Sequence, residues 1–454
     1  MRGLTVTASG DPPHAPPDQH AFARRSLRVI DGVVSLGEGS SLALDAFDLP
    51  LEAVRARFAT AAQQGHPTWL WPELSVADWQ AAVVDLADAI ATILAGRPAR
   101  IHRAPTAIGI AAYSSGTGPL LGLWLERGLL AADDDVAALL RLHLHHNRLR
   151  MAMLTTETTH LATALAARGV QATMLKGLHT AHGYFPAAGA RPVSDIDLLV
   201  DPADEPVAAG VLAELGYVAG RPSRGIPPQR DWRRAEVSEA PHTLSFVHYR
   251  DPWSIDMQGS LNRRYAPGAP IARLDDLRGN GQVTPGAATL PQPLLLLHLA
   301  VHAGCGFQNL NLIRLVELIL VIRHDDESGA LAWPAFLDAG RRTGALGMAF
   351  AALQLSEDLA PGTVPANVLA ACRDAAPARL RRLVAGLTPA TAHRVARRSF
   401  AEKFIWQRTG LGLARQLIAE ILPADVTLAG AARIYHTRAM KLLHRAPLSS
   451  ATPQ

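Results

Sequence analysis

The sequence predicts an α+β fold, a small mixed β-sheet core with helices, embedded in a mainly helical chain. Three observations support this class. The 454 residues are 48% hydrophobic but only 5% aromatic, and the abundance of alanine and leucine favours helix. Short apolar runs of strand length occur between residues 170 and 257. Longer stretches with helical periodicity come before and after them.

The overall composition restricts the function. A formal net charge of +4 over this length gives no general affinity for nucleic acids or membranes. Two cysteines, Cys305 and Cys372, exclude a disulfide framework and a cysteine zinc site, and they fit a reducing cytoplasm. The longest apolar tract, residues 294–307, contains His298 and His302 and is too short to span a bilayer. We therefore expect a cytoplasmic protein without a membrane partner.

The chain divides into five expected parts. They are a disordered lead-in (1–26), an N-terminal extension of unclear fold (27–72), an N-terminal helical region (73–168), a core that contains the predicted strands (169–290) and a C-terminal helical region (291–447). Prolines in residues 1–26 and the lack of an apolar centre there argue against a secretory signal.

Helix signals become clear after residue 74. Ser75 with Asp78 three residues later forms a capping box and predicts a helix that runs to about Leu94. A second helix is expected over residues 117–132. A long amphipathic helix over residues 134–168 then leads directly into the first strand of the core.

The core begins with a strand, a turn and a short helix. Residues 170–175 are apolar and β-branched, which predicts a strand that ends at Lys176-Gly177. Residues 178–184 are expected to form a short helix that starts at the glycine. Glycines and prolines then break the chain into a loop before a second strand at residues 195–200.

The second strand carries two carboxylates on one face. Side chains alternate along a strand, so Asp195 and Asp197 share a face while Ile196, Leu198 and Val200 take the other. Two neighbouring carboxylates repel each other and are costly to bury without a partner. A divalent cation resolves this conflict. Oxygen-only ligands suit Mg²⁺, which commonly bridges carboxylates to phosphates of a substrate.

The pattern Leu175-Lys176-Gly177, followed by Arg191, Ser194 and the Asp-Ile-Asp strand, resembles the active-site core of the polymerase β-like nucleotidyltransferase superfamily. More narrowly, it resembles the bacterial family of uncharacterised nucleotidyltransferases, in which Leu-Lys-Gly stands where most relatives carry Gly-Ser. A lone Asp-x-Asp is usually a solvated loop or strand end. Combined with Lys-Gly at this spacing and a later Ile-Asp, it favours an active site.

The resemblance implies a two-metal site built from three acids. Asp195 and Asp197 would hold one Mg²⁺ that bridges the triphosphate. The third acid lies on a later strand in the superfamily, and Asp256 in residues 253–257 is the candidate here. Asp197 and Asp256 would hold the second ion, and Asp256 would also accept the proton of the acceptor. Mn²⁺ is expected to substitute for Mg²⁺.

The resemblance also implies a set of nucleotide-binding residues. The turn would hold the triphosphate, with a lysine that neutralises phosphate charge, backbone N–H groups at the helix start and an arginine fork. The residues expected in this set are Lys176, Gly177, Leu178, Arg191 and Ser194.

The segment between the second and third acids is rich in Pro, Gly and Arg. Residues 219–241 are read as a solvated loop, with a lid over the triphosphate as the alternative. Residues 242–249 alternate and predict a strand that forms a hairpin with residues 253–257. After the third acid the family usually has a histidine and a tryptophan. This chain has Gln258 and Gly259 instead, which leaves open what replaces that histidine.

The chain from residue 291 on is expected to be helical, with helices over 310–323, 333–343, 348–359 and 427–444 in addition to the tract at 294–307. His298 and His302 lie four residues apart on one helix face, a spacing that can bind zinc. The glutamate of a metalloprotease helix is missing, so packing behind the catalytic residues is favoured over metal binding.

These features predict an enzyme that transfers an NMP, with AMP from ATP preferred, to an unknown small molecule, peptide or protein and releases pyrophosphate. One alternative is a toxin–antitoxin style nucleotidyltransferase that acts on a partner protein or on tRNA, the one nucleic acid expected as an acceptor. Another is a non-catalytic nucleotide-binding scaffold. Acids at all three positions argue against the scaffold, which would not need to hold them together.

Overall fold

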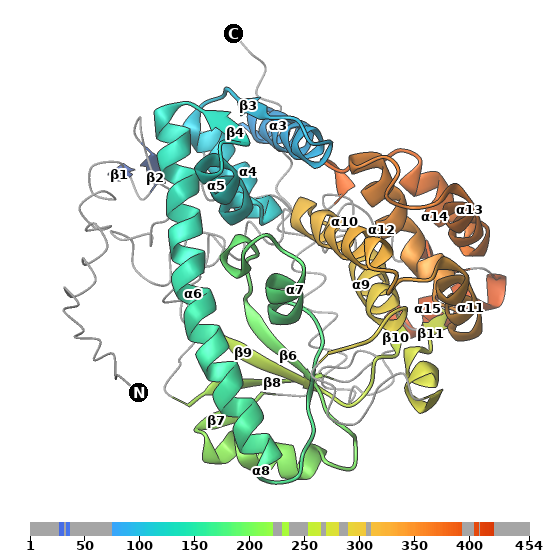
Figure 1. Ribbon diagram of the computed structural model, residues 1–454. Coiled ribbons are helices and arrows are strands. Elements are labelled where there is room, and N and C mark those ends of the chain that lie inside the picture. The colour runs from blue at the N-terminus through green and yellow to red at the C-terminus, as the bar shows by residue number, and fades with distance from the viewer. Residues whose placement is uncertain are drawn as a thin grey trace, which may run out of the picture.

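The computed structural model describes residues 27–30, 33–36, 75–220, 229–235, 253–264, 269–280, 289–305, 310–392, 404–407 and 409–421. These residues build a five-stranded sheet surrounded by helices, and the predicted α+β class is confirmed (Figure 1). Near the N-terminus, β1 (Leu27–Ile30) and β2 (Val33–Leu36) pair as an antiparallel hairpin.

The first described helix begins where its capping box predicts. Helix α3 (Val76–Leu94) starts after Ser75, whose Oγ accepts a hydrogen bond of 3.0 Å from the backbone N–H of Asp78. This bond satisfies one of the donors that a helix start leaves without an intrahelical partner.

The next two helices differ from the sequence prediction. Helix α4 (Pro105–Ser115) was not predicted, and α5 (Gly118–Glu126) occupies only the first part of the helix expected over residues 117–132. Gly128 has a φ of 69°, which continues no right-handed helix. Beyond it, β4 (Leu130–Ala132) pairs in parallel with β3 (Ala99–Ile101).

Helix α6 (Asp134–Ala166) is the long helix expected before the core. In Figure 1 it runs along one side of the molecule, from α4 and α5 at one end to the sheet at the other. Its first turns bury Leu140 and Leu144 in a core shared with α3 and α5, and its last turns bury Leu161 and Leu165 under the sheet. It therefore connects the N-terminal helices to the sheet.

The main sheet has the strand order β5-β6-β9-β8-β7. Only β6 and β9 run parallel; the other neighbours are antiparallel. The strands are β5 (Thr173–Met174), β6 (Asp195–Leu199), β7 (Tyr217–Ala219), β8 (Gln229–Arg234) and β9 (Ser254–Gln258). Helix α7 (Leu178–Gly183) and the 3₁₀ turn η2 (Ala188–Ala190) connect β5 to β6, and α8 (Glu205–Glu214) connects β6 to β7.

The basic segment between the second and third acids differs from the prediction. Residues 229–234, read as part of a loop, form β8, which pairs antiparallel with β9. The two edges of β9 are therefore bonded to β6 and β8. The strand predicted at residues 242–249, which was expected beside β9, lies outside the described residues.

One face of the sheet is packed against α6 and α8. Ile196 and Leu198 of β6 and Ile255 and Met257 of β9 are all buried in this second core. This confirms the predicted alternation, because the aspartates between these residues must then point to the opposite face.

The described part of the C-terminal region is helical, as predicted. Its helices are α9 (Leu294–Cys305), α10 (Leu312–Glu327), α11 (Trp333–Thr343), α12 (Leu346–Leu359), α13 (Ala366–Ala375), α14 (Ala378–Val384) and α15 (Gly410–Ile421). Between the sheet and α9 lie the short strands β10 (Arg263–Arg264) and β11 (Ile271–Ala272) and the 3₁₀ helix η3 (Leu274–Asn280). The helix predicted at 427–444 lies outside the described residues.

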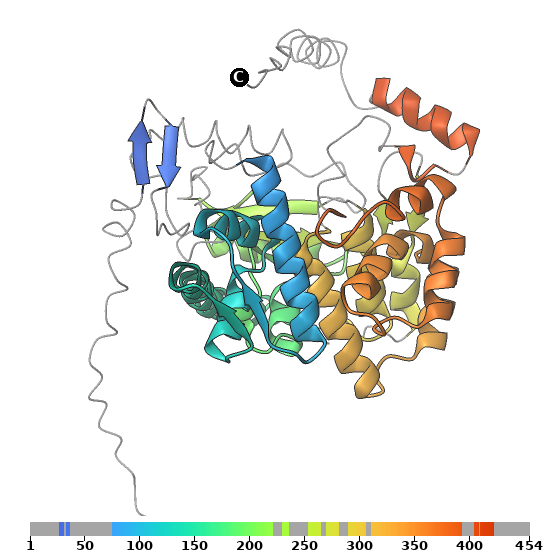
Figure 2. The ribbon, with the colours of Figure 1, turned by 90° about the horizontal axis from the view of Figure 1, so that it is seen from above.

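The N-terminal and C-terminal helices share one hydrophobic core. Trp79 of α3, Leu297 of α9, Leu353 of α12 and Trp406 all belong to it. Figure 2 shows α3, in blue, between the helices that follow it and the orange C-terminal helices. None of the helices in the described ranges combines the length and the apolar content needed to cross a membrane.

Candidate functional site

Three carboxylates meet on the face of the sheet opposite α6 and α8. Because β6 and β9 are parallel neighbours, their register places Asp197 directly opposite Asp256. Asp195, Asp197 and Asp256 each offer a ligand atom, and these atoms all lie within 4.8 Å of one another. Within the described ranges, no other group of three or more His, Cys, Asp or Glu ligands lies close enough to hold a metal ion. The three acids named from the sequence are thus brought together.

The acids repel one another strongly. Burial and, after it, the charges of Asp195 and Asp197 raise the pKa of Asp256 to about 8. Burial also raises the pKa of Asp197, against the attraction of the Lys176 ammonium. A divalent cation between these oxygens would reverse the repulsion, and a set made only of carboxylate oxygens suits Mg²⁺ or Mn²⁺. The residues present therefore fit the metal that the sequence predicts.

Lys176 lies against the same acids. Its Nζ donates a hydrogen bond of 2.6 Å to Oδ1 of Asp197, and both side chains are buried. The lysine follows β5, which pairs with β6, so the two short strands bring the ammonium to the second acid. The sequence predicted a lysine that faces phosphate; the structure places it beside the acids that would carry the metal.

The turn after Lys176 needs its glycine. Gly177 has a φ of 65° and a ψ of −99°, a conformation that residues with a Cβ rarely adopt. A Cβ there would also lie 3.4 Å from Cγ1 of Val193, in the loop before β6. Leu178 begins α7 directly after this turn. The binding of phosphate by the N–H groups of Gly177 and Leu178 stays a prediction.

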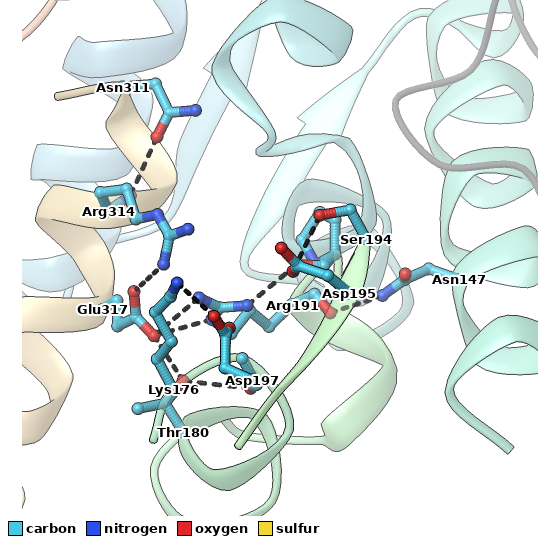
Figure 3. Close-up of polar contacts among 12 residues, drawn as sticks. Asn147, Lys176, Thr180, Arg191, Ser194, Asp195, Asp197, Asn311, Arg314 and Glu317 are labelled. Atoms are coloured by element: carbon cyan, nitrogen blue, oxygen red, sulfur yellow. Dashed lines mark hydrogen bonds and ion pairs between the residues drawn. The ribbon is translucent and has the colours of Figure 1, made fainter. Parts of the chain in front are cut away.

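Arg191 is held entirely by contacts within the protein. Its Nε donates to Oε1 of Glu317 at 2.8 Å, Nη2 lies 2.8 Å from the same oxygen, and Nη1 donates to the carbonyl of Pro192 at 3.0 Å. Thr180 of α7 also donates to this carboxylate oxygen. Glu317, on α10, thus ties the predicted arginine fork and the short helix to the C-terminal region (Figure 3).

Helix α6 holds the loop that leads into β6. Asn147 donates to the carbonyls of Gly189 and Arg191 at 2.7 and 2.9 Å. Arg150 donates to the carbonyls of Val193 and Ser194 at 2.8 and 3.0 Å. The Oγ of Ser194, in turn, donates to Oδ1 of Asp195 at 3.0 Å. The position of the first acid therefore depends on a helix that precedes it in the chain.

Two further polar residues lie beside the third acid. Asp231 of β8 is exposed and stands directly opposite Asp256 in the register, and its charge adds to the raised pKa of Asp256. Gln258, two residues after Asp256 on the same face, is buried, and Nη2 of Arg263 donates to its Oε1 at 3.4 Å.

His298 and His302 of α9 do not form a metal-ligand group with the three acids. His298 is fully buried, and its two ring nitrogens have no hydrogen-bond partner among the residues that the structure describes. Burial, followed by the charges of Arg263 and Lys176, lowers its pKa well below the usual value. Neither His298 nor His302 belongs to a group of metal ligands. This burial favours packing inside the fold, which the sequence analysis preferred to metal binding.

Several residues that build the site were not identified from the sequence. Among them, Glu317 carried a usable signal: a carboxylate between Val316 and Leu318, inside an apolar stretch of a predicted helix. A charge in such a position is almost never buried without a partner. The others carried none, because a polar residue in a helix or loop is usually solvated. These are Asn147, Arg150, Thr180 and Arg314.

Comparison with known proteins agrees with this geometry. A family model described as "Uncharacterised nucleotidyltransferase" matches residues 113–361, which include α6, the whole sheet, α9 and α10. No curated protein and no solved structure matches the chain.

Proposed function

Because the chain belongs to the uncharacterised nucleotidyltransferase family, we propose that it transfers an NMP from an NTP to an acceptor nucleophile with release of pyrophosphate. AMP from ATP is the preferred transfer. The acceptor is a small molecule, a peptide or a protein, with tRNA as the alternative. In this reaction the acceptor forms a bond to the α-phosphorus. The bond from that phosphorus to the bridging oxygen of the β-phosphate breaks, and pyrophosphate leaves with the electron pair.

The observation that carries the proposal is the meeting of three carboxylates on two neighbouring parallel strands, within 4.8 Å of one another. Asp195 and Asp197 would hold one divalent ion, and Asp197 and Asp256 a second. When bound, these ions would neutralise charge on the triphosphate and lower the pKa of the acceptor. Asp256 would accept the proton that the acceptor loses.

The residues around the first acid would bind the nucleotide. Lys176 would neutralise phosphate charge at the edge of the metal site. The backbone N–H groups of Gly177 and Leu178, at the start of α7, would face phosphate oxygens. Ser194 lies within hydrogen-bonding distance of Asp195 and would contact the same nucleotide. Arg191 would add its positive charge to the phosphate-binding turn from the protein side of that turn.

The proposed site can be tested by replacing Asp256 with asparagine, which keeps the shape and removes one negative charge. Turnover, measured as pyrophosphate release, should fall by about 100-fold or more, because phosphoryl chemistry depends on electrostatic stabilisation. NTP affinity should change much less, since Asp195 and Asp197 remain. The matched control is Asp231→Asn, on the neighbouring strand and opposite Asp256, but exposed and outside the group of three. It should cost less than about tenfold, because exposed charges are screened.

The wild-type assay also separates the functional classes. Purified protein, each labelled NTP in turn, Mg²⁺ and a cell lysate are incubated, and label is then sought in small molecules, protein and RNA. Label in one fraction identifies the acceptor class. Equal turnover by wild type and Asp256→Asn would remove Asp256 from the site. NTP binding without turnover on any fraction would support the non-catalytic scaffold instead.

A further inference from the structure

The start of α10 brings two charged side chains toward the acids. Asn311 caps the helix and accepts a hydrogen bond of 3.3 Å from the backbone N–H of Arg314. Arg314 and Glu317 lie three residues apart and therefore on the same helix face. Figure 3 shows the guanidinium of Arg314 pointing from α10 toward the Lys176–Asp197 pair.

Two guanidinium groups share the single carboxylate of Glu317. Arg191 uses Oε1, as does Thr180, and Nη1 of Arg314 donates to Oε2 at 3.1 Å. Glu317 is only 2% exposed, and both of its carboxylate oxygens accept hydrogen bonds from protein donors. Because one negative charge faces two positive ones, this buried cluster carries a surplus positive charge beside the acids.

The two arginines differ in how many of their guanidinium nitrogens already bond to other described residues. The Arg191 side chain is 4% exposed and its three guanidinium nitrogens are engaged. The Arg314 side chain is 25% exposed, and within the part of the chain that the structure describes it donates only to Glu317. Arg314 therefore keeps N–H groups for a ligand, while Glu317 holds the guanidinium in place.

The charge surroundings identify the kind of ligand. Against the opposing effect of burial, the carboxylate of Glu317 and, after it, those of Asp195 and Asp197 raise the pKa of Arg314. A divalent cation on the two aspartates would neutralise them and leave Arg314 without their compensation. The ligand that restores the balance must be an anion that arrives next to the metal. A planar guanidinium with free donors suits phosphate oxygens in particular.

We propose that Arg314 is a nucleotide-binding residue that contacts the β- or γ-phosphate of the NTP, oriented by its ion pair with Glu317. This inference rests on the proposed function and assigns to it a residue from the C-terminal helices, far in sequence from the Lys-Gly turn. Arg314 thereby distinguishes nucleoside triphosphates from monophosphates.

The test is calorimetric binding of ATP and of AMP, each with Mg²⁺, to wild type, Arg314→Ala and Arg314→Gln. The glutamine variant keeps most of the side-chain volume and a donor for Glu317, and it decides the question if the alanine variant does not fold. Both variants should bind ATP about 10- to 100-fold more weakly, as expected for a lost charge-assisted hydrogen bond, and bind AMP as wild type does. Arg342→Gln, which breaks an exposed ion pair with Asp338 on α11, should bind both like wild type.

Three outcomes count against the proposal. If wild type binds ATP and the Arg314 variants bind it equally well, the inference is wrong while the proposed function stands. If the variants lose ATP and AMP affinity to the same extent, Arg314 supports the structure of the site and does not contact the phosphates. If wild type binds no nucleoside triphosphate at all, both the inference and the proposed function are wrong.

Discussion

At the scale of single residues, charge compensation governs the site. Both side chains of the Lys176–Asp197 pair are buried, so water stabilises neither charge well and each charge depends on the other. Asp197 already has a raised pKa because burial outweighs the attraction of the ammonium. The lysine therefore offsets part of the cost of burying this carboxylate.

Replacing Lys176 with methionine keeps the packing of the stem and removes the ammonium. The uncompensated carboxylate should destabilise the metal-free protein by about 3 kcal/mol, the lower end of the cost of breaking a buried pair. Mg²⁺ should recover much of this loss, because it replaces the missing positive charge. Thermal unfolding with and without Mg²⁺ measures both effects, and the Mg²⁺-induced rise in Tm should be larger in the variant than in wild type.

The comparison for this experiment is Arg103→Met. Arg103 pairs with Asp85, and both side chains are about one-third exposed. Its loss should cost at most about 1 kcal/mol and should not respond to Mg²⁺. A Lys176→Met protein with the same Mg²⁺ response as wild type would mean that the lysine does not compensate the acids.

At the scale of elements, the first acid depends on a contact between a helix and a loop. Strand β6 begins at Asp195, directly after the backbone carbonyls that Arg150 binds. The guanidinium also lies 5.9 Å from the ring centroid of Trp253, the residue before β9. One buried side chain of α6 therefore touches the start of both strands that carry the acids.

The Arg150→Ala variant should lose about 3 kcal/mol of stability, because two carbonyls lose a charged donor in the interior. It should also bind NTP and Mg²⁺ more weakly, since Asp195 and Asp256 lose their fixed separation. Chemical denaturation and calorimetry provide the two readings. Arg148→Ala on the same helix breaks an exposed pair with Glu126 and should cost about 0.5 kcal/mol. If the two variants had equal effects, the loop before β6 would keep its conformation without the hydrogen bonds of Arg150.

At the scale of the whole molecule, the sheet cannot be separated from the helices on either side. Residues 169–290 are proposed as the catalytic core, but the hydrogen bonds of Asn147 and Arg150 come from before this segment and those of Glu317 from after it. Helices α3 and α12, one before and one after this segment, also pack together in one core.

The segment 169–290 expressed alone should therefore fail to fold, whereas residues 75–421 should unfold in one cooperative transition. Circular dichroism during heating, with calorimetry as a second probe, distinguishes the two. A cooperative transition for 169–290 alone would show that the flanking helices are independent domains. Two separate transitions for 75–421 would show that the shared core does not couple the helical regions.

The sequence alone determined the features that depend on neighbouring residues. The capping box at Ser75, the helix over 333–343, the glycine turn at 177 and the shared face of Asp195 and Asp197 are local, because backbone geometry and side-chain alternation decide them. The third acid was also identified, through resemblance and a short strand pattern. Residues 229–234 were not recognised as a strand, because their charged side chains hide the alternation that a half-buried strand shows.

Only the tertiary structure decided which distant residues complete the site. Thr180 and Glu317 are 137 positions apart, and Arg150 and Ser194 are 44 apart, yet each pair is joined by a hydrogen bond. No local preference marks such partners, since an arginine or glutamate in a helix looks the same whether it is solvated or buried. The physical reason is that a buried charge is tolerated only beside its partner, and the packing of whole helices determines where that partner lies.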